Sequence, residues 1–130
     1  MAGSPSYAAT PNTGVAQLDT ANTNRDGTGT IVDILTGATN GTRVEERKLK
    51  ATGDPADSTV VWYIKKSGTY YAYDEWDIGN PSAGSTTVPS YQETRQERWL
   101  ILKNGEILAA SITVALTSGK INAWAVGADF

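Results

Sequence analysis

Residues 59–78 read TVVWYIKKSGTYYAYDEWDI, and this stretch decides the fold class. Its first part, residues 59–65, is apolar on both faces of a period-two alternation, which indicates a strand at the centre of a sheet. Ser67-Gly68 is a turn dipeptide, and residues 70–78 alternate again. The two segments are therefore expected to pair as a β-hairpin.

The rest of the chain repeats this pattern of short apolar segments separated by turn signals. Four tryptophans, six tyrosines and 13 glycines in 130 residues are typical of an all-β protein rich in turns. We predict a single domain over residues 15–130, an eight-stranded antiparallel β-sandwich that is jelly-roll-like. The expected strands are 15–18, 30–35, 43–50, 59–65, 70–78, 91–102, 107–116 and 121–126.

Two segments depart from the regular pattern. Residues 1–14 contain two of the five prolines and few side chains that a core could bury, so a flexible N-terminal arm is expected there. In the strand 43–50 the only apolar residues are Val44 and Leu49, which lie on opposite faces. An edge strand or a β-bulge is therefore expected.

Aromatic side chains gather in the predicted hairpin. One face of the strand 70–78 carries Tyr70, Ala72, Trp76 and Ile78. We expect this face inside the sandwich, because strand residues two apart point the same way. Tyr71 and Tyr73 then lie on the other face, and they are candidates for contact with another protein or for stacking on a sugar.

The composition excludes several classes of function. The chain has no cysteine and no histidine, so thiolate metal sites and thiol nucleophiles are impossible and the commonest general base is missing. We predict a protein without enzymatic activity and without a cofactor. The net charge of −3 argues against a nucleic-acid-binding protein with a broad basic face. The N-terminus lacks the pattern of a signal peptide, and apolar runs such as residues 99–102 are too short to cross a membrane.

Acidic residues suggest two alternative sites. Asp74, Glu75 and Asp77 resemble the carboxylates of a glycosidase cleft, but neighbouring strand residues point to opposite faces. A solvated strand end is the favoured interpretation. Asp54 and Asp57 lie in a loop and have the ligand type that calcium prefers, yet a turn that an Asp caps is favoured there.

Alternating charges mark a further candidate interface. Arg43, Glu45 and Arg47 share one face of a predicted strand. Such a pattern suits cross-strand ion pairs on a wet face or contacts between subunits.

Four further stretches are distinctive together: ANTNRDGTGT at residues 21–30, GTRV at 41–44 leading to KATG at 50–53, LKNGEILAAS at 102–111, and INAWAVGADF at 121–130. From about residue 15 onward the chain thereby resembles a family of small virion-associated proteins of tailed bacteriophages. Members of that family tend to close with a short strand that ends in Gly-Gly-Asp-aromatic or a similar tail. This chain differs in ending with Gly-Ala-Asp-Phe and in the charged segment 43–50.

The resemblance implies a capsid-decorating (cement) protein or another protein of the particle surface, made in the cytoplasm of the bacterial host. The implied partners are the major capsid protein or other virion proteins, and the chain itself as a dimer or trimer, with neither nucleic acid nor membrane. The arm could then order against a neighbouring subunit. A tail, baseplate or fibre-associated component and a carbohydrate-binding β-sandwich module are the alternatives. The candidate interface residues are Tyr7, Pro11, Arg43, Arg47, Tyr71, Tyr73 and Phe130.

Overall fold

The computed structural model describes residues 7–79, 82–97, 100–115 and 118–130. Every regular element in these ranges is a strand, which confirms the predicted all-β class, and none is a helix that could span a membrane. The strands are β1 (Thr10–Leu18), β2 (Val32–Thr36), β3 (Thr42–Ala51), β4 (Ser58–Lys66), β5 (Thr69–Ile78), β6 (Gln92–Gln96), β7 (Ile101–Leu102), β8 (Ile107–Ile112) and β9 (Ile121–Asp129).

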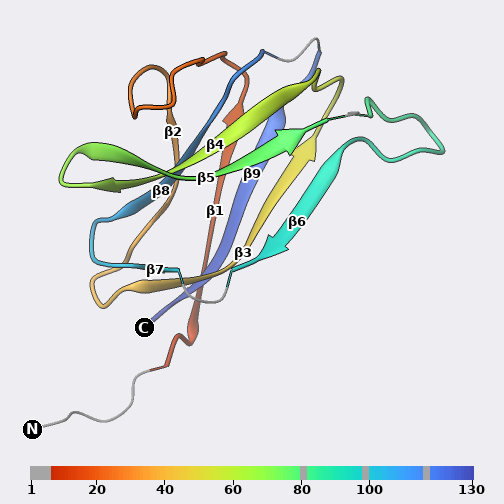
Figure 1. The fold of residues 1–130 in the computed structure, drawn as a ribbon. Helices are drawn as coiled ribbons and strands as arrows, with labels where there is room; N and C mark the ends of the chain where they lie inside the picture. The colour runs from red at the N-terminus through yellow and green to blue at the C-terminus, as the bar shows by residue number, and fades with distance from the viewer. Residues whose placement is uncertain (1–6, 80–81, 98–99, 116–117) are drawn as a thin grey trace, which may run out of the picture.

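The strands form two antiparallel sheets that pack as a β-sandwich (Figure 1). The first sheet has the order β1–β9–β3–β6, with β7 also paired to β3, and the second sheet has the order β2–β8–β4–β5. The pairing is nested, because β1 pairs with β9, β2 with β8, β3 with β6, and β4 with β5. Each sheet therefore joins strands that are far apart in the sequence.

The hairpin β4–β5 forms as predicted, and β4 lies in the interior of the second sheet. Its two-residue turn, Ser67 and Gly68, has positive φ angles of 51° and 84°, which is the geometry that matches the twist of a hairpin. Trp62 of β4 is fully buried between the sheets. Its ring packs against that of Trp76 with 4.9 Å between the centroids, so the hairpin also supplies the centre of the core.

The prediction of an edge position for the strand 43–50 is wrong, because β3 lies between β9 and β6. The alternative expectation, a β-bulge, is confirmed: the register with β9 shifts between Val44 and Glu46. The inserted residue, Glu45, changes the alternation of the strand. Val44 and Leu49, which strict alternation would place on opposite faces, therefore both lie in the core.

The predicted strand 91–102 is interrupted, which gives nine strands in the described residues instead of eight. β6 and β7 both pair with β3, and the break between them lies opposite the bulge of β3. There the N–H of Glu97 donates to the carbonyl of Glu45 (2.7 Å), and the N–H of Val44 donates to that of Leu100 (2.9 Å). A bulge disrupts the regular ladder, and the partner strand is broken at that point.

The boundary of the predicted N-terminal arm is also corrected. β1 begins at Thr10, and residues 10–14 pair with residues 125–129 of β9. Backbone pairing needs no apolar side chains, so the polar composition of this segment did not reveal the strand. Residues 1–6 of the predicted arm lie outside the described residues.

The loop between β1 and β2, residues 19–31, covers the outer face of the second sheet. Beneath this loop, Val61, Tyr63 and Ala109 form a second, smaller apolar cluster. The hydroxyl of Tyr63 donates to the backbone carbonyl of Asn24 in the loop (3.2 Å). The loop therefore acts as a third layer over this sheet.

Candidate functional site

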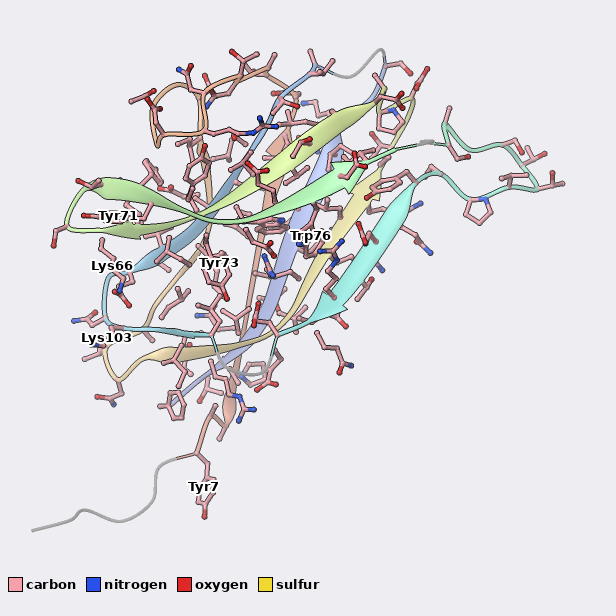
Figure 2. All side chains as sticks on the ribbon, viewed as in Figure 1. Tyr7, Lys66, Tyr71, Tyr73, Trp76 and Lys103 are labelled. Carbon is pink, nitrogen blue, oxygen red and sulfur yellow. The ribbon has the colours of Figure 1, made fainter. Side chains whose placement is uncertain are left out.

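An apolar groove of about 420 Å³ opens at one side of the sandwich, between the edge strand β5 and strand β7. Figure 2 shows Tyr71, Tyr73 and Lys66 together on this side of the molecule. We call this surface the aromatic groove. Its lining consists of Ile64, Tyr71, Ala72, Tyr73, Leu100 and Ile101, together with the charged Lys66 and Glu106.

A β-bulge in β5 sets the direction of the groove tyrosines. In the register with β4, Asp74 and Ala72 pair with successive residues, so Tyr73 is an extra residue in its strand. An extra residue inverts the alternation beyond it. Tyr71 and Tyr73 are 56% and 44% exposed, and both line the groove, so they are open to a partner.

The same bulge corrects the predicted inner face of this strand. Trp76 and Ile78, which follow the bulge, are buried in the core as predicted. Tyr70 and Ala72, which precede it, are outside the main core. The ring of Tyr70 instead packs edge-on against Tyr63 on the outer face, with 6.2 Å between the centroids.

The charged side chains of the aromatic groove neutralise one another. Lys66 Nζ lies 3.2 Å from Glu106 Oε2, and Glu106 Oε1 accepts a hydrogen bond from the backbone N–H of Lys103 (2.7 Å). This backbone bond, followed by the contact with Lys66, holds the pKa of Glu106 below its ordinary value. The groove thus presents an apolar surface with a balanced ion pair beside it.

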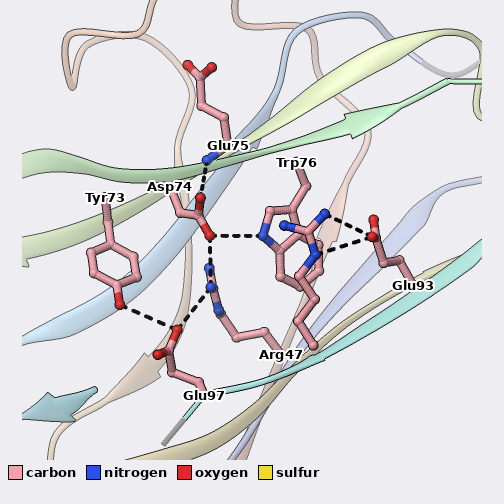
Figure 3. Close-up of polar contacts among 8 residues, drawn as sticks. Arg47, Tyr73, Asp74, Glu75, Trp76, Glu93 and Glu97 are labelled. Carbon is pink, nitrogen blue, oxygen red and sulfur yellow. Dashed lines mark hydrogen bonds and ion pairs between the residues drawn. The ribbon is translucent and has the colours of Figure 1, made fainter. Parts of the chain in front are cut away.

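A buried arginine joins the two sheets next to the groove (Figure 3). Arg47 of β3 is 4% exposed, and its Nη2 donates to Asp74 Oδ2 (2.9 Å) and to Glu97 Oε2 (3.0 Å). The guanidinium carbon also lies 5.0 Å from the ring centroid of Trp62 and 4.9 Å from that of Trp76. Two carboxylates and the faces of aromatic rings offset part of the cost of burying this charge, while Arg47 Nε and Nη1 are buried without a hydrogen-bond partner among the described residues.

The prediction that Arg47 shares a wet face with Arg43 is therefore wrong. The bulge at Glu45 turns Arg47 inward, whereas Arg43 stays on the outer face, where its Nε lies 3.0 Å from Glu45 Oε1. Because Arg47 is buried, its side chain stabilises the sandwich and offers no surface to a partner.

Of the acidic residues near Trp76, Asp74 belongs to this ion-pair cluster, whereas Glu75 pairs with Arg25. Asp74 accepts a further hydrogen bond from Trp76 Nε1 (3.0 Å). Partial burial would raise the pKa of Asp74, but the hydrogen bonds from Arg47 and Trp76 outweigh it and lower the pKa below its ordinary value. A carboxylate that is held ionised is a poor proton donor, so Asp74 is unsuited to act as a general acid.

Asp54 caps its own loop, as the favoured interpretation of the sequence predicts. Its Oδ1 accepts a hydrogen bond from the N–H of Ala56 at 3.2 Å. Within the described residues, no group of three or more acidic side chains is arranged to hold a metal ion.

The two ends of the described chain meet at one end of the first sheet. The N–H of Ala9 donates to the backbone carbonyl of Asp129 (3.0 Å). The Asp129 carboxylate accepts hydrogen bonds from Asn12 Nδ2 (2.9 Å) and from Thr42 Oγ1 (2.7 Å). The aspartate of the C-terminal Gly-Ala-Asp-Phe therefore links β9 to both of its neighbouring strands.

Three of the predicted interface residues lie at this end. Tyr7 is 77% exposed, and Pro11 is exposed on β1. Phe130 is half-buried beside Gly41. A Cβ added to Gly41 would lie 3.6 Å from Phe130 Cδ2 and 3.8 Å from Ile101 Cγ2. Phe130 therefore lies near Ile101 of the aromatic groove but is not among the residues that line the groove.

Of the eight residues that line the groove, sequence reasoning predicted only Tyr71 and Tyr73. Leu100 and Ile101 are among those it missed, and outside the groove it missed Trp124. Leu100 and Ile101 belong to an apolar run that was assigned to a continuous strand, yet Ile101 is 50% exposed. The available signal was that Ile101 and Leu102 are neighbours, so only one of them can face the core. Trp124 lies on the outer face of the first sheet, between Val15 and Lys48 of the adjacent strands.

Comparison with known proteins gives no further guide, since neither a family model nor a curated protein sequence matches this chain.

Proposed function

We propose that this protein is a structural component of a tailed-phage particle, and specifically a capsid-decorating (cement) protein that binds the outer shell as a homo-oligomer. The aromatic groove is the observation that carries the proposal. An exposed apolar patch beside charged residues is typical of a protein–protein contact site. Tyrosine side chains supply much of the binding energy at such sites, and Tyr71 and Tyr73 are both exposed there.

The strand order supports the finer assignment of the fold as a jelly roll. When β6 and β7 are counted as one interrupted strand, eight strands pair first with last, second with seventh, third with sixth and fourth with fifth. Viral capsid domains and lectins use this double-sheet arrangement. A shared fold is an analogy for function, so this support ranks below the groove.

The chemistry of the groove suits a protein that occupies many equivalent positions on a shell. Contacts of moderate strength, repeated over a lattice and linked by self-association, give strong attachment overall. Because Lys66 and Glu106 already neutralise each other, docking of an apolar segment leaves no unpaired charge in the groove.

The first test is the copy number of this chain in purified particles of the phage that encodes it, measured by quantitative mass spectrometry. A copy number close to that of the major capsid protein is the expected result. A handful of copies would instead support the alternative of a tail, baseplate or fibre component. Absence of the chain from the particle would contradict the proposal.

The second test is binding of the purified protein to shells that lack it, measured by co-sedimentation. Tyr71→Ala and Tyr73→Ala are each expected to weaken binding about tenfold, as truncation of an interface tyrosine does. Val114→Ala is the matched control, because Val114 is 44% exposed outside the groove. Equal binding by all three variants would remove the groove from the interface.

The exposed tyrosines also favour a second candidate function, a carbohydrate-binding module, since aromatic rings stack on sugars. Binding on a glycan array that is lost in Tyr71→Ala would support this function. Binding to shells but to no glycan would support the particle role.

A further inference from the structure

We propose that the outer face of the first sheet is a self-association surface, on which a second copy of this chain packs about a twofold axis. This inference deepens the homo-oligomer part of the proposed function. On this face, which we call the bare face, Val15 is 48% and Val126 is 36% exposed, and the half-buried Trp124 neighbours Val15 across the strands and Val126 along its own strand. The polar side chains around these three are Thr13, Gln17, Glu46, Lys48, Lys50, Gln92, Thr94, Gln96 and Asn122.

The strand register arranges the bare face in rows that cross the sheet. One row contains Val15, Trp124 and Lys48, which are direct neighbours on β1, β9 and β3. The next row on the same face contains Thr13, Val126 and Glu46. Each row therefore holds one large apolar residue on β9 and one charge on β3, and the two charges have opposite sign.

This arrangement is self-complementary under one particular twofold operation. An axis that runs across the strands, midway between the two rows, places each strand over its own copy in the opposite direction. Lys48 then faces Glu46 of the second copy, and Trp124 faces Val126. A twofold interface uses the same patch on both subunits, so each of these contacts occurs twice.

The charges that this operation pairs, Lys48 and Glu46, have no ionic partner in the part of the chain that the structure describes. The other cations of the face are already engaged, since Arg43 contacts Glu45 (3.0 Å) and Lys50 Nζ donates to Ser90 Oγ (2.6 Å). Complementary charges in opposed rows also fix the register in which two copies meet.

The shape of the bare face fits the same contact. Two hollows, of about 390 and about 460 Å³, lie on either side of Val126 and give the large ring of an opposed Trp124 space to enter. Three strands of nine or ten residues and the five-residue β6, about 4.8 Å apart, make a face of roughly 20 by 30 Å at its widest. With its side-chain relief, such a face provides an area of the order of the 800 Å² per partner found in stable interfaces.

The test is sedimentation velocity of the whole chain over a concentration series, with a charge swap across the proposed axis. The wild-type chain is expected to form a dimer. Lys48→Glu and Glu46→Lys are each expected to raise the dissociation constant at least about tenfold, because each opposes like charges twice. The double variant Lys48→Glu/Glu46→Lys restores opposite charges and is expected to return the constant to within about threefold of wild type.

Lys103→Glu is the control for the change in net charge, because Lys103 is exposed and lies outside the bare face. It is expected to leave the dimer unchanged, and thermal unfolding checks that every variant is folded. A wild-type chain that stays monomeric, single variants that still dimerise, or a double variant that is not restored would each overturn the proposal. Binding to shells through the aromatic groove is measured separately, so its failure would contradict the particle role and leave the self-association result standing.

Discussion

The two sheets of this sandwich differ in what lies over their outer faces. On the second sheet, Tyr63 is fully buried beneath the loop 19–31. On the first sheet, Val15 and Val126 remain exposed next to the half-buried Trp124. Both faces carry apolar side chains at alternate strand positions, so the difference lies in whether the chain itself supplies a cover.

This difference determines whether a face contributes to the folding stability of the chain or to its association with a partner. A covered apolar face is part of the folded core, because unfolding returns its side chains to water. An uncovered apolar face gains little from folding alone and gains its burial only when a partner arrives. Equivalent substitutions on the two faces are therefore expected to change different measured quantities.

The largest expected contrast comes from replacing one aromatic residue on each face. Tyr63→Ala removes a fully buried ring and the hydrogen bond to the carbonyl of Asn24, and is expected to lower the free energy of unfolding by about 3–5 kcal/mol. Trp124 is half-buried on the outer face, so Trp124→Ala is expected to lower it by a smaller amount, about 1–2 kcal/mol. Urea unfolding measures both, in a Lys48→Glu background so that subunit dissociation does not contribute. Equal losses would show that Trp124 belongs to the core.

Two asparagines, one in the covering loop and one on the bare face, test what holds the loop in place. Asn22 is buried, and its Nδ2 donates to the carbonyls of Thr28 (2.9 Å) and Thr30 (3.0 Å), while its Oδ1 accepts the N–H of Asn24 (3.0 Å). Asn22→Ala is expected to cost about 1–3 kcal/mol and to speed hydrogen exchange in the loop.

Asn122, on the bare face, is the matched control for this substitution. Its Oδ1 has no hydrogen-bond partner among the described residues. Because this oxygen is buried without a partner, Asn122→Ala breaks no hydrogen bond of Oδ1 and is expected not to lower the unfolding free energy. If hydrogen exchange in the loop is the same in Asn22→Ala and Asn122→Ala, the loop is held by something other than Asn22.

The sequence was most informative where structure is set locally. The hairpin of residues 59–78 follows from alternation and from the turn Ser67-Gly68, both of which lie within the segment. The position of β3 does not follow in this way. Its charged residues suggested an edge, but a central strand can carry charges on a face that no other layer covers, and nothing within the segment shows this.

The candidate surfaces were predictable only in part, for a related reason. Alternation indicates which residues share a face, but a bulge shifts that pattern, as Glu45 does in β3 and Tyr73 does in β5. Arg47 was therefore placed on the wrong side of its strand. Alternation also cannot tell what lies over a face, because the cover comes from a segment distant in sequence. Tyr71 and Tyr73 could be identified as exposed, whereas the role of Trp124 required the strand register.

The covered face also contains a tyrosine, Tyr70, whose titration makes the stability of the protein depend on pH. The Tyr70 hydroxyl donates to Asp33 Oδ1 (2.6 Å), and burial, followed by this bond, raises the pKa of Tyr70 from about 10 to about 12. The folded state thus keeps a proton that the unfolded state loses. The resulting contribution to stability is complete below pH 10 and disappears as the pH rises through 12. Tyr70→Phe is expected to show a shallower fall in unfolding free energy across this range than wild type, and identical slopes would contradict the assignment.

The smallest expected effect concerns the ion pair between the covering loop and the second sheet. Arg25 Nε lies 2.9 Å from Glu75 Oε1, but the two side chains are 55% and 48% exposed. Water and salt screen such a pair, so a double-mutant cycle with Arg25→Ala and Glu75→Ala is expected to give a coupling energy below about 0.5 kcal/mol. A coupling as large as the loss in Asn22→Ala would mean that charge holds the loop in place, and the cover would then loosen in high salt. A small coupling would leave the buried contacts of Tyr63 and Asn22 as the interactions that keep one face of the sandwich covered.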